Sequence, residues 1–140
     1  MNPSVVINVE NSYKDIDRRI IAIDVICKGV NLSICNVYAP TNRQLQGKFL
    51  QILNEFMTSN LNITQLIVGG DWNVTLDSID KKGGISLKPT AYRNGIISMM
   101  EELSKFLKVK SRIDYCLIAK HLTQYAYNVE TKTAITPDHN

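Results

Sequence analysis

The chain has 140 residues, of which 44% are hydrophobic and 21% charged, with a formal net charge of +3. This length corresponds to a single domain, and the composition is globular, which excludes a disordered or fibrous chain. The mild basic excess is compatible with nucleic acid but lacks the dense positive charge of a dedicated nucleic-acid binder. No apolar run reaches the roughly 18 residues of a membrane span, and no signal peptide is recognisable, so we expect an intracellular protein of the nucleus or cytoplasm.

The first third of the sequence is predicted to form β-strands. Residues 4–8 (SVVIN) predict a strand, and residues 19–27 and 31–38 are rich in β-branched side chains. The segment Lys28-Gly29-Val30 separates the last two runs, which is typical of a hairpin. We therefore expect two antiparallel strands here.

A helix is predicted next, over about residues 43–58. Thr41 and Asn42 are good N-cap types, and the apolar residues that follow have the spacing of one helical face: Leu45, Phe49, Ile52, Leu53 and Phe56.

The run Leu66-Ile67-Val68 is short, apolar and followed by two glycines, which is typical of a buried strand with helices on both faces. Asp71 and Asn73 would lie just past its end. At two-residue spacing in extended backbone, their side chains would project to the same side.

The remaining sequence predicts a loop over residues 80–88, a second helix and more strand. Pro89 opens the helix, which extends to about Leu107 despite Gly95, a residue that costs about 1 kcal/mol inside a helix. Its predicted inner face consists of Ile96, Met99, Met100, Leu103 and Leu107. Strand-like sequence follows at residues 112–118 and 125–129.

This order of elements predicts an α+β fold in one domain over residues 1–140, with helices outside the sheet and active loops at strand ends. Three cysteines, odd in number and set in apolar runs, predict buried free thiols rather than disulfides or a zinc site.

Four short clusters hold most of the chemically interesting side chains: residues 36–40, 70–73, 111–115 and 137–139. Asp138-His139 is a pairing that acid/base sites use. Adjacent strand residues point in opposite directions, so Asp114 is the candidate to orient His139.

Each cluster also has a structural interpretation. The terminal Asp138-His139 could be a solvated tail, Asp114 could pair with Arg112, Tyr38 could be a core aromatic, and the Asp71 and Asn73 pair could form a turn.

All four clusters occur in one order with a Lys/Gly loop, as NVYAPTN at 36–42, GGDWN at 69–73, DKKGG at 80–84, SRIDY at 111–115 and PDHN at 137–140. On these motifs the chain resembles the endonuclease/exonuclease/phosphatase superfamily, and most closely the apurinic-type endonuclease domain of non-LTR (LINE-type) retrotransposons. The resemblance implies an incomplete four-layer α/β/β/α sandwich that hydrolyses phosphate esters with Mg²⁺ or Mn²⁺.

The resemblance also implies roles for particular residues. Asp71 resembles the carboxylate that aligns or deprotonates the attacking water, Asn73 the amide that holds a phosphate oxygen, and Tyr38 the tyrosine that contacts the phosphate. Asp114 resembles the carboxylate that orients the histidine, His139 that histidine, and Asp138 the acidic neighbour near the metal.

The sequence departs from the family pattern in three places. No strand with the family's Asn and metal-ligating Glu precedes Ser4, residues 108–110 replace a longer segment, and no strand follows His139. Glu55, Glu101 and Glu102 fall on predicted helix surfaces and do not replace the missing ligand. We therefore expect weak metal binding and impaired activity.

Three functional hypotheses follow. The first is a metal-dependent DNA endonuclease that nicks the phosphate backbone, with a reverse transcriptase domain expected only in a complete element. The second is an inactive retroelement remnant that binds nucleic acid weakly through a set of basic residues: Lys81, Lys82, Lys108, Lys110 and Arg112. The third is a phosphatase-type member of the same superfamily.

Overall fold

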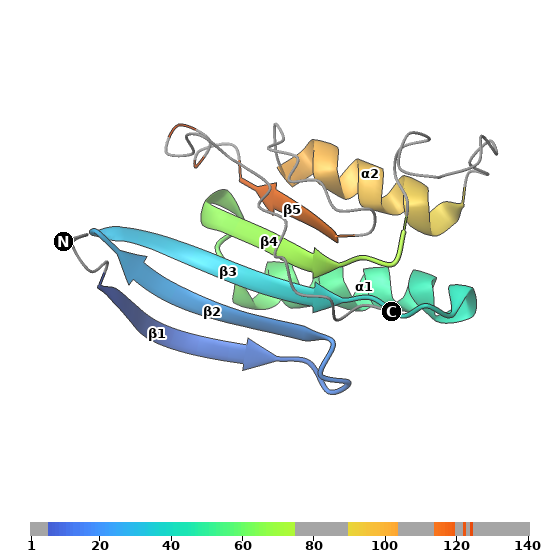
Figure 1. The fold of residues 1–140 in the computed structure, drawn as a ribbon, viewed down its shortest axis with the longest axis horizontal. Helices are drawn as coiled ribbons and strands as arrows, with labels where there is room; N and C mark the ends of the chain where they lie inside the picture. Colours follow the sequence, from blue (N-terminus) through green and yellow to red (C-terminus); the bar gives the residue numbers. More distant parts are fainter. Residues whose placement is uncertain (1–5, 75–89, 104–113, 120–121, 123, 125–140) are drawn as a thin grey trace, which may run out of the picture.

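The computed structural model describes residues 6–74, 90–103, 114–119, 122 and 124, which form one five-stranded sheet with helices packed against it (Figure 1). The elements in chain order are β1 (Ile7–Lys14), β2 (Ile20–Cys27), β3 (Val30–Tyr38), α1 (Arg43–Asn60), η1 (Ile63–Gln65), β4 (Leu66–Asp71), α2 (Ala91–Leu103) and β5 (Asp114–Ile118).

The strands lie in the sheet in their chain order, from β1 to β5. Neighbours are antiparallel except β3 and β4, which are parallel and are connected through α1. The predicted hairpin of β2 and β3 is confirmed, and its turn residues Lys28 and Gly29 have φ of 49° and 76°. Positive φ at both positions is what a tight two-residue hairpin turn requires.

Both helices pack on the same face of the sheet, where one apolar core joins them to the strands. Val37 of β3, Val68 of β4, Leu53 of α1 and Ile96 of α2 are fully or almost fully buried in this core. The described helices cover only one face of the strand at Leu66, so the prediction of helices on both faces is not confirmed. The burial of β4 alternates, with Leu66 and Val68 buried and Ile67 half-buried, as expected where one face meets these helices.

The first strand and first helix also differ from expectation. β1 begins at Ile7 and continues to Lys14, through a polar stretch that carried no apolar strand signal. In α1, Phe49, Leu53 and Phe56 are buried as predicted and Asn42 is the N-cap, but Leu45 is 50% exposed. Gln46 occupies the buried position at this end of the helix.

The α+β class and the second helix are confirmed, with Ile96 and Met99 buried in α2. Gly95 has a packing role, since a Cβ there would run into Leu50 of α1. The cysteines are free, with Cys35 buried and Cys27 and Cys116 half-buried. The predicted strand at 125–129 and the loop at 80–88 lie outside the described residues, and the single-domain assignment stays a prediction.

The predicted surface glutamates Glu55, Glu101 and Glu102 are exposed on their helices. Within the described part of the chain, no helix combines the length and the apolar character that crossing a membrane requires.

Candidate active site at the ends of the central strands

Three predicted site residues occupy adjacent positions across neighbouring strands. Tyr38, the last residue of β3, is the register partner of Asp71, the last residue of β4. Asp71 is in turn the partner of Asp114, the first residue of β5. We call Tyr38, Asp71 and Asp114 the cross-strand row. Sequence segments more than thirty residues apart therefore meet at one edge of the sheet, as the cluster pattern predicted.

Asn73 reaches this edge by a turn and not in extended backbone. Its φ is 47°, and its backbone N–H donates to Asp71 Oδ1 at 2.9 Å. Its side-chain Nδ2 donates to the carbonyl oxygen of Ala39 at 2.6 Å. The predicted same-side projection from an extended strand was wrong, because Asn adopts the left-handed region readily and Asp accepts from a backbone N–H two residues on. The turn interpretation and the site interpretation of this motif are thus compatible.

Two residues that the sequence did not single out hold this turn in place. Tyr92 of α2 donates its hydroxyl to the carbonyl oxygen of Trp72 at 2.7 Å, and Trp72 itself is fully buried. Burial, and secondarily the Asp71 carboxylate, raises the pKa of Tyr92. Gln46 of α1 donates through Nε2 to the carbonyl oxygens of Pro40 at 3.0 Å and of Asn73 at 3.4 Å. Both helices therefore anchor the turn that carries Asp71.

Gly70 explains why glycine precedes the aspartate. Its φ is +134°, and a Cβ at this position would run into the carbonyl oxygen of Val37 on the neighbouring strand. The backbones of β3 and β4 approach closely here, which only glycine permits. Ala39 then extends the pairing, since its N–H donates to the carbonyl oxygen of Asp71 at 2.8 Å.

Tyr38 is 54% exposed, so its side chain is accessible at this edge and is not the core aromatic of the alternative interpretation. The guanidinium of Arg19 donates through one nitrogen to the carbonyl oxygen of Tyr38 at 3.2 Å. Its central carbon also lies 5.5 Å from the centroid of the Tyr38 ring, within the range of a cation–π contact.

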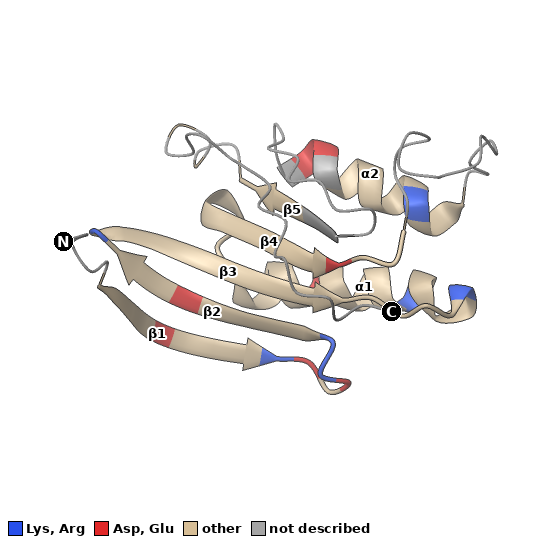
Figure 2. Ribbon diagram, viewed as in Figure 1, with Lys and Arg blue, Asp and Glu red and all other residues tan. Residues whose placement is uncertain are grey.

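Segments that carry basic residues lie toward the same end of the sheet (Figure 2). Blue segments at the end of β1, in the β1–β2 turn, at the start of α1 and in the first turn of α2 lie on the side where β4 ends. The residues are Lys14, Arg18, Arg19, Arg43, Lys48 and Arg93. Asp15 and Asp17 lie in the same β1–β2 turn and offset part of this charge.

Asp138 and His139, and the basic residues predicted to bind nucleic acid, lie outside the described residues. Asp114 is placed by its backbone register alone. Among the described residues, no group of three or more His, Cys, Asp or Glu side chains is positioned to hold a metal ion.

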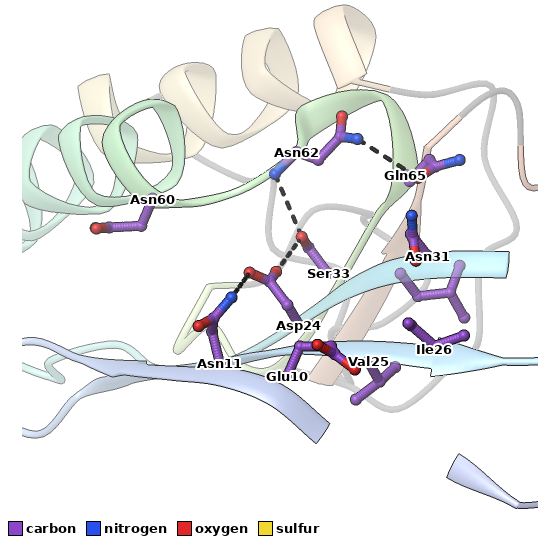
Figure 3. A pocket seen from close by; sticks show the side chains of 11 residues that line it. Glu10, Asn11, Asp24, Val25, Ile26, Asn31, Ser33, Asn60, Asn62 and Gln65 are labelled. Atoms are coloured by element: carbon purple, nitrogen blue, oxygen red, sulfur yellow. Dashed lines mark hydrogen bonds between the residues drawn. The ribbon is translucent and has the colours of Figure 1, made fainter. Parts of the chain in front are cut away.

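A polar cavity of about 500 Å³ lies toward the other end of the strands (Figure 3). Asp24 accepts hydrogen bonds there from Ser33 Oγ at 2.7 Å and Asn11 Nδ2 at 3.5 Å. Tyr13 also donates to Asp24, at 3.0 Å, and this hydrogen bond raises the pKa of Tyr13. The Asp24 network connects β1, β2 and β3, so its evident role is structural.

Comparison with known proteins supports the fold. No protein-family model matches the chain. The transposon TX1 uncharacterized 149 kDa protein of Xenopus laevis is 28% identical over 141 residues, which cover 87% of this chain and 11% of that protein. The endonuclease domain of TRAS1, a telomere-specific non-LTR retrotransposon, matches with a TM-score of 0.56 at 12% identity, over 81% of this chain and 57% of that domain. The chain therefore shares the fold of this endonuclease domain over the part that matches.

A second solved structure, humanized D. rerio TDP2, has a TM-score of 0.44 at 14% identity, over 81% of this chain and 52% of its own. The chain thus spans little more than half the length of these solved structures. Its two described layers, one sheet and the helices on one face, correspond to part of the predicted four-layer endonuclease/exonuclease/phosphatase sandwich.

Proposed function

We propose that this chain carries a phosphodiester-hydrolysing site of the endonuclease type, which nicks DNA with the help of a divalent metal ion. The observation that carries the proposal is the cross-strand row, which places Tyr38, Asp71 and Asp114 side by side in the register of three strands. The Asn73 turn lies next to it. A carboxylate and neutral donors at one point can position a water molecule and stabilise the charge that develops on a phosphodiester during hydrolysis.

DNA is the proposed substrate because of the relatives and the charge at this edge. One relative is named as a transposon protein and one solved structure as a retrotransposon endonuclease domain. The basic segments in Figure 2 lie around the same edge, and positive charge there favours a polyanion. A reverse transcriptase partner domain is proposed only for a complete element.

The oxygen donors at this edge suit Mg²⁺ or Mn²⁺. Asp71 accepts from Asn73 through Oδ1, which leaves its second oxygen available to a cation or a water molecule, and the backbone of Asp114 lies at the next register position. We propose that Asp138 belongs to the same site. A bound Mg²⁺ would stabilise the negative charge that develops on the phosphoryl oxygens.

We propose a separate role in hydrolysis for each of the remaining side chains. Asp71, fixed by the Asn73 N–H, would align the attacking water and accept its proton. Asn73 Nδ2 carries two N–H groups. One donates to the carbonyl oxygen of Ala39, so the other can donate to a phosphate oxygen. The exposed Tyr38 hydroxyl would donate to the same phosphate, and Asp114 would orient His139.

The test is nicking of supercoiled plasmid by the purified chain, with and without Mg²⁺. We expect nicking that EDTA abolishes and that Asp71→Asn lowers by about 10² to 10⁴. Glu55→Gln is the matched control, because Glu55 is an exposed carboxylate on α1 and its loss should leave nicking unchanged. A folded chain that does not nick, or an Asp71→Asn variant with full activity, would refute the proposal.

A further inference from the structure

Arg19 extends the cross-strand row by one strand. Its carbonyl oxygen accepts from the N–H of Tyr38 at 2.8 Å, one step beyond the register pair of Ile20 and Val37. Arg19, directly before β2, Tyr38 at the end of β3 and Asp71 at the end of β4 therefore follow one another across the sheet. Register partners share a face of a sheet, and the contact between the Arg19 guanidinium and the Tyr38 ring confirms that these two side chains do so.

The guanidinium of Arg19 is held in place but is not neutralised. Its hydrogen bond to the Tyr38 carbonyl and its position near the Tyr38 ring fix its location. Asp15, four residues before Arg19, uses Oδ1 to accept the backbone N–H groups of Arg19 and Ile20, both at 2.8 Å. Among the described residues, no carboxylate forms an ion pair with the Arg19 side chain.

The Arg19 guanidinium, fixed in this way, has further N–H groups that can donate to a ligand. A guanidinium carries five N–H groups in a rigid fork, and that geometry matches phosphate oxygens. One hydrogen bond to a carbonyl oxygen, donated through Nη1, leaves most of these N–H groups available beside the exposed Tyr38 hydroxyl. Arg19 and Lys48 also line a cavity of about 110 Å³. Asp15 and Asp17 line the same cavity, so two cations and two carboxylates adjoin it.

We propose that Arg19 is a substrate-binding residue, which holds a backbone phosphate of DNA next to the one that the cross-strand row cleaves. The proposal rests on the proposed function, because it takes the row to face a phosphodiester. It assigns Arg19 two tasks, contact with the DNA phosphate and orientation of the Tyr38 ring. Neither task was predicted from the sequence.

The experiment measures binding of a short fluorescent DNA duplex by anisotropy over a range of salt concentrations. Arg19→Gln should weaken binding at low salt about tenfold and lower the slope of log affinity against log salt by about 0.9, the value for one phosphate contact. Arg19→Lys should keep the slope but recover only part of the affinity, because an ammonium lacks the fork.

The matched control is Lys28→Asn, at the far end of the same sheet. Lys28 is exposed and has φ of 49°, which Asn tolerates, so this variant removes one charge without strain and should leave the slope unchanged. Equal slopes for Arg19→Gln and Lys28→Asn would overturn the proposal, as would a parent chain that does not bind DNA.

Plasmid nicking by the same variants separates this inference from the proposed function. A chain that does not nick, but loses one phosphate contact with Arg19→Gln, would contradict the hydrolytic function and retain the phosphate site. A chain that nicks normally with Arg19→Gln and keeps its full salt slope would contradict only the role of Arg19.

Discussion

Substitution of Gly70 by alanine tests whether the close approach of β3 and β4 builds the site. Gly70 has φ of +134°, and an added Cβ would meet the backbone of Val37, with its carbonyl oxygen nearest, rather than a movable side chain. Forcing an L-residue into such a conformation costs about 1–3 kcal/mol, and overpacking against a fixed neighbour costs about 1–3 kcal/mol more. We expect Gly70→Ala to lower the free energy of unfolding by about 4 kcal/mol.

The assay is urea unfolding followed by far-UV circular dichroism, with comparison of midpoints and slopes. Gly47→Ala provides the control, since Gly47 is exposed within α1 and a Cβ there would contact nothing within 4 Å. Alanine at that position should raise stability by about 0.5–1 kcal/mol. If Gly70→Ala were as stable as the parent, the two strands could not approach as described, and the position of Asp71 beside Tyr38 would lose its basis.

Three further predictions concern the surroundings of the site. Tyr92→Phe should destabilise the chain by about 1–3 kcal/mol, because the Trp72 carbonyl loses its donor, and an unchanged urea midpoint would show that this hydrogen bond is not made. Burial, and secondarily the Asp15 carboxylate, raises the pKa of Cys35 from 9.0 to about 12, so the unfolded chain loses this proton first and stability should fall as pH rises between these values. Cys35→Ala should reduce that fall. Identical profiles of unfolding free energy against pH for the parent and Cys35→Ala would contradict this prediction. Asn73→Gly and Asn73→Val both remove the hydrogen bond to the Ala39 carbonyl. Because Asn73 has φ of 47°, the valine variant should be less stable than the glycine variant by about 1–2 kcal/mol, and equal stability of the two would refute the turn.

The local elements could be predicted from the sequence because each depends on neighbours along the chain. The Lys28-Gly29 turn, the Asn42 cap and the apolar spacing of α1 act over a few residues, and they were confirmed apart from the exposed Leu45. β1 was only partly predicted. Its residues are mostly exposed on both faces, so no alternation of apolar and polar residues marks them.

The meeting of the motifs could be predicted in outline, because strand ends at one edge of a sheet converge. The contacts that fix the site could not. Tyr92 reaches Trp72 from another helix, and Gln46 reaches Asn73 across 27 positions. Arg19 adjoins Tyr38 through the pairing of β2 with β3. The spacing of residues in the sequence does not predict such contacts, because they form between distant segments only when the chain folds.

The hydrolytic role of Asp71 is the central claim, and the initial rate of plasmid nicking tests it most directly. The rate should be measured in Mg²⁺ for the parent, Asp71→Asn and Glu55→Gln, after circular dichroism has shown that all three are folded. We predict that Glu55→Gln nicks like the parent and that Asp71→Asn is slower by at least about 10². Equal rates for the parent and Asp71→Asn, or no nicking by the folded parent, would contradict the assignment of a hydrolytic site to this edge of the sheet.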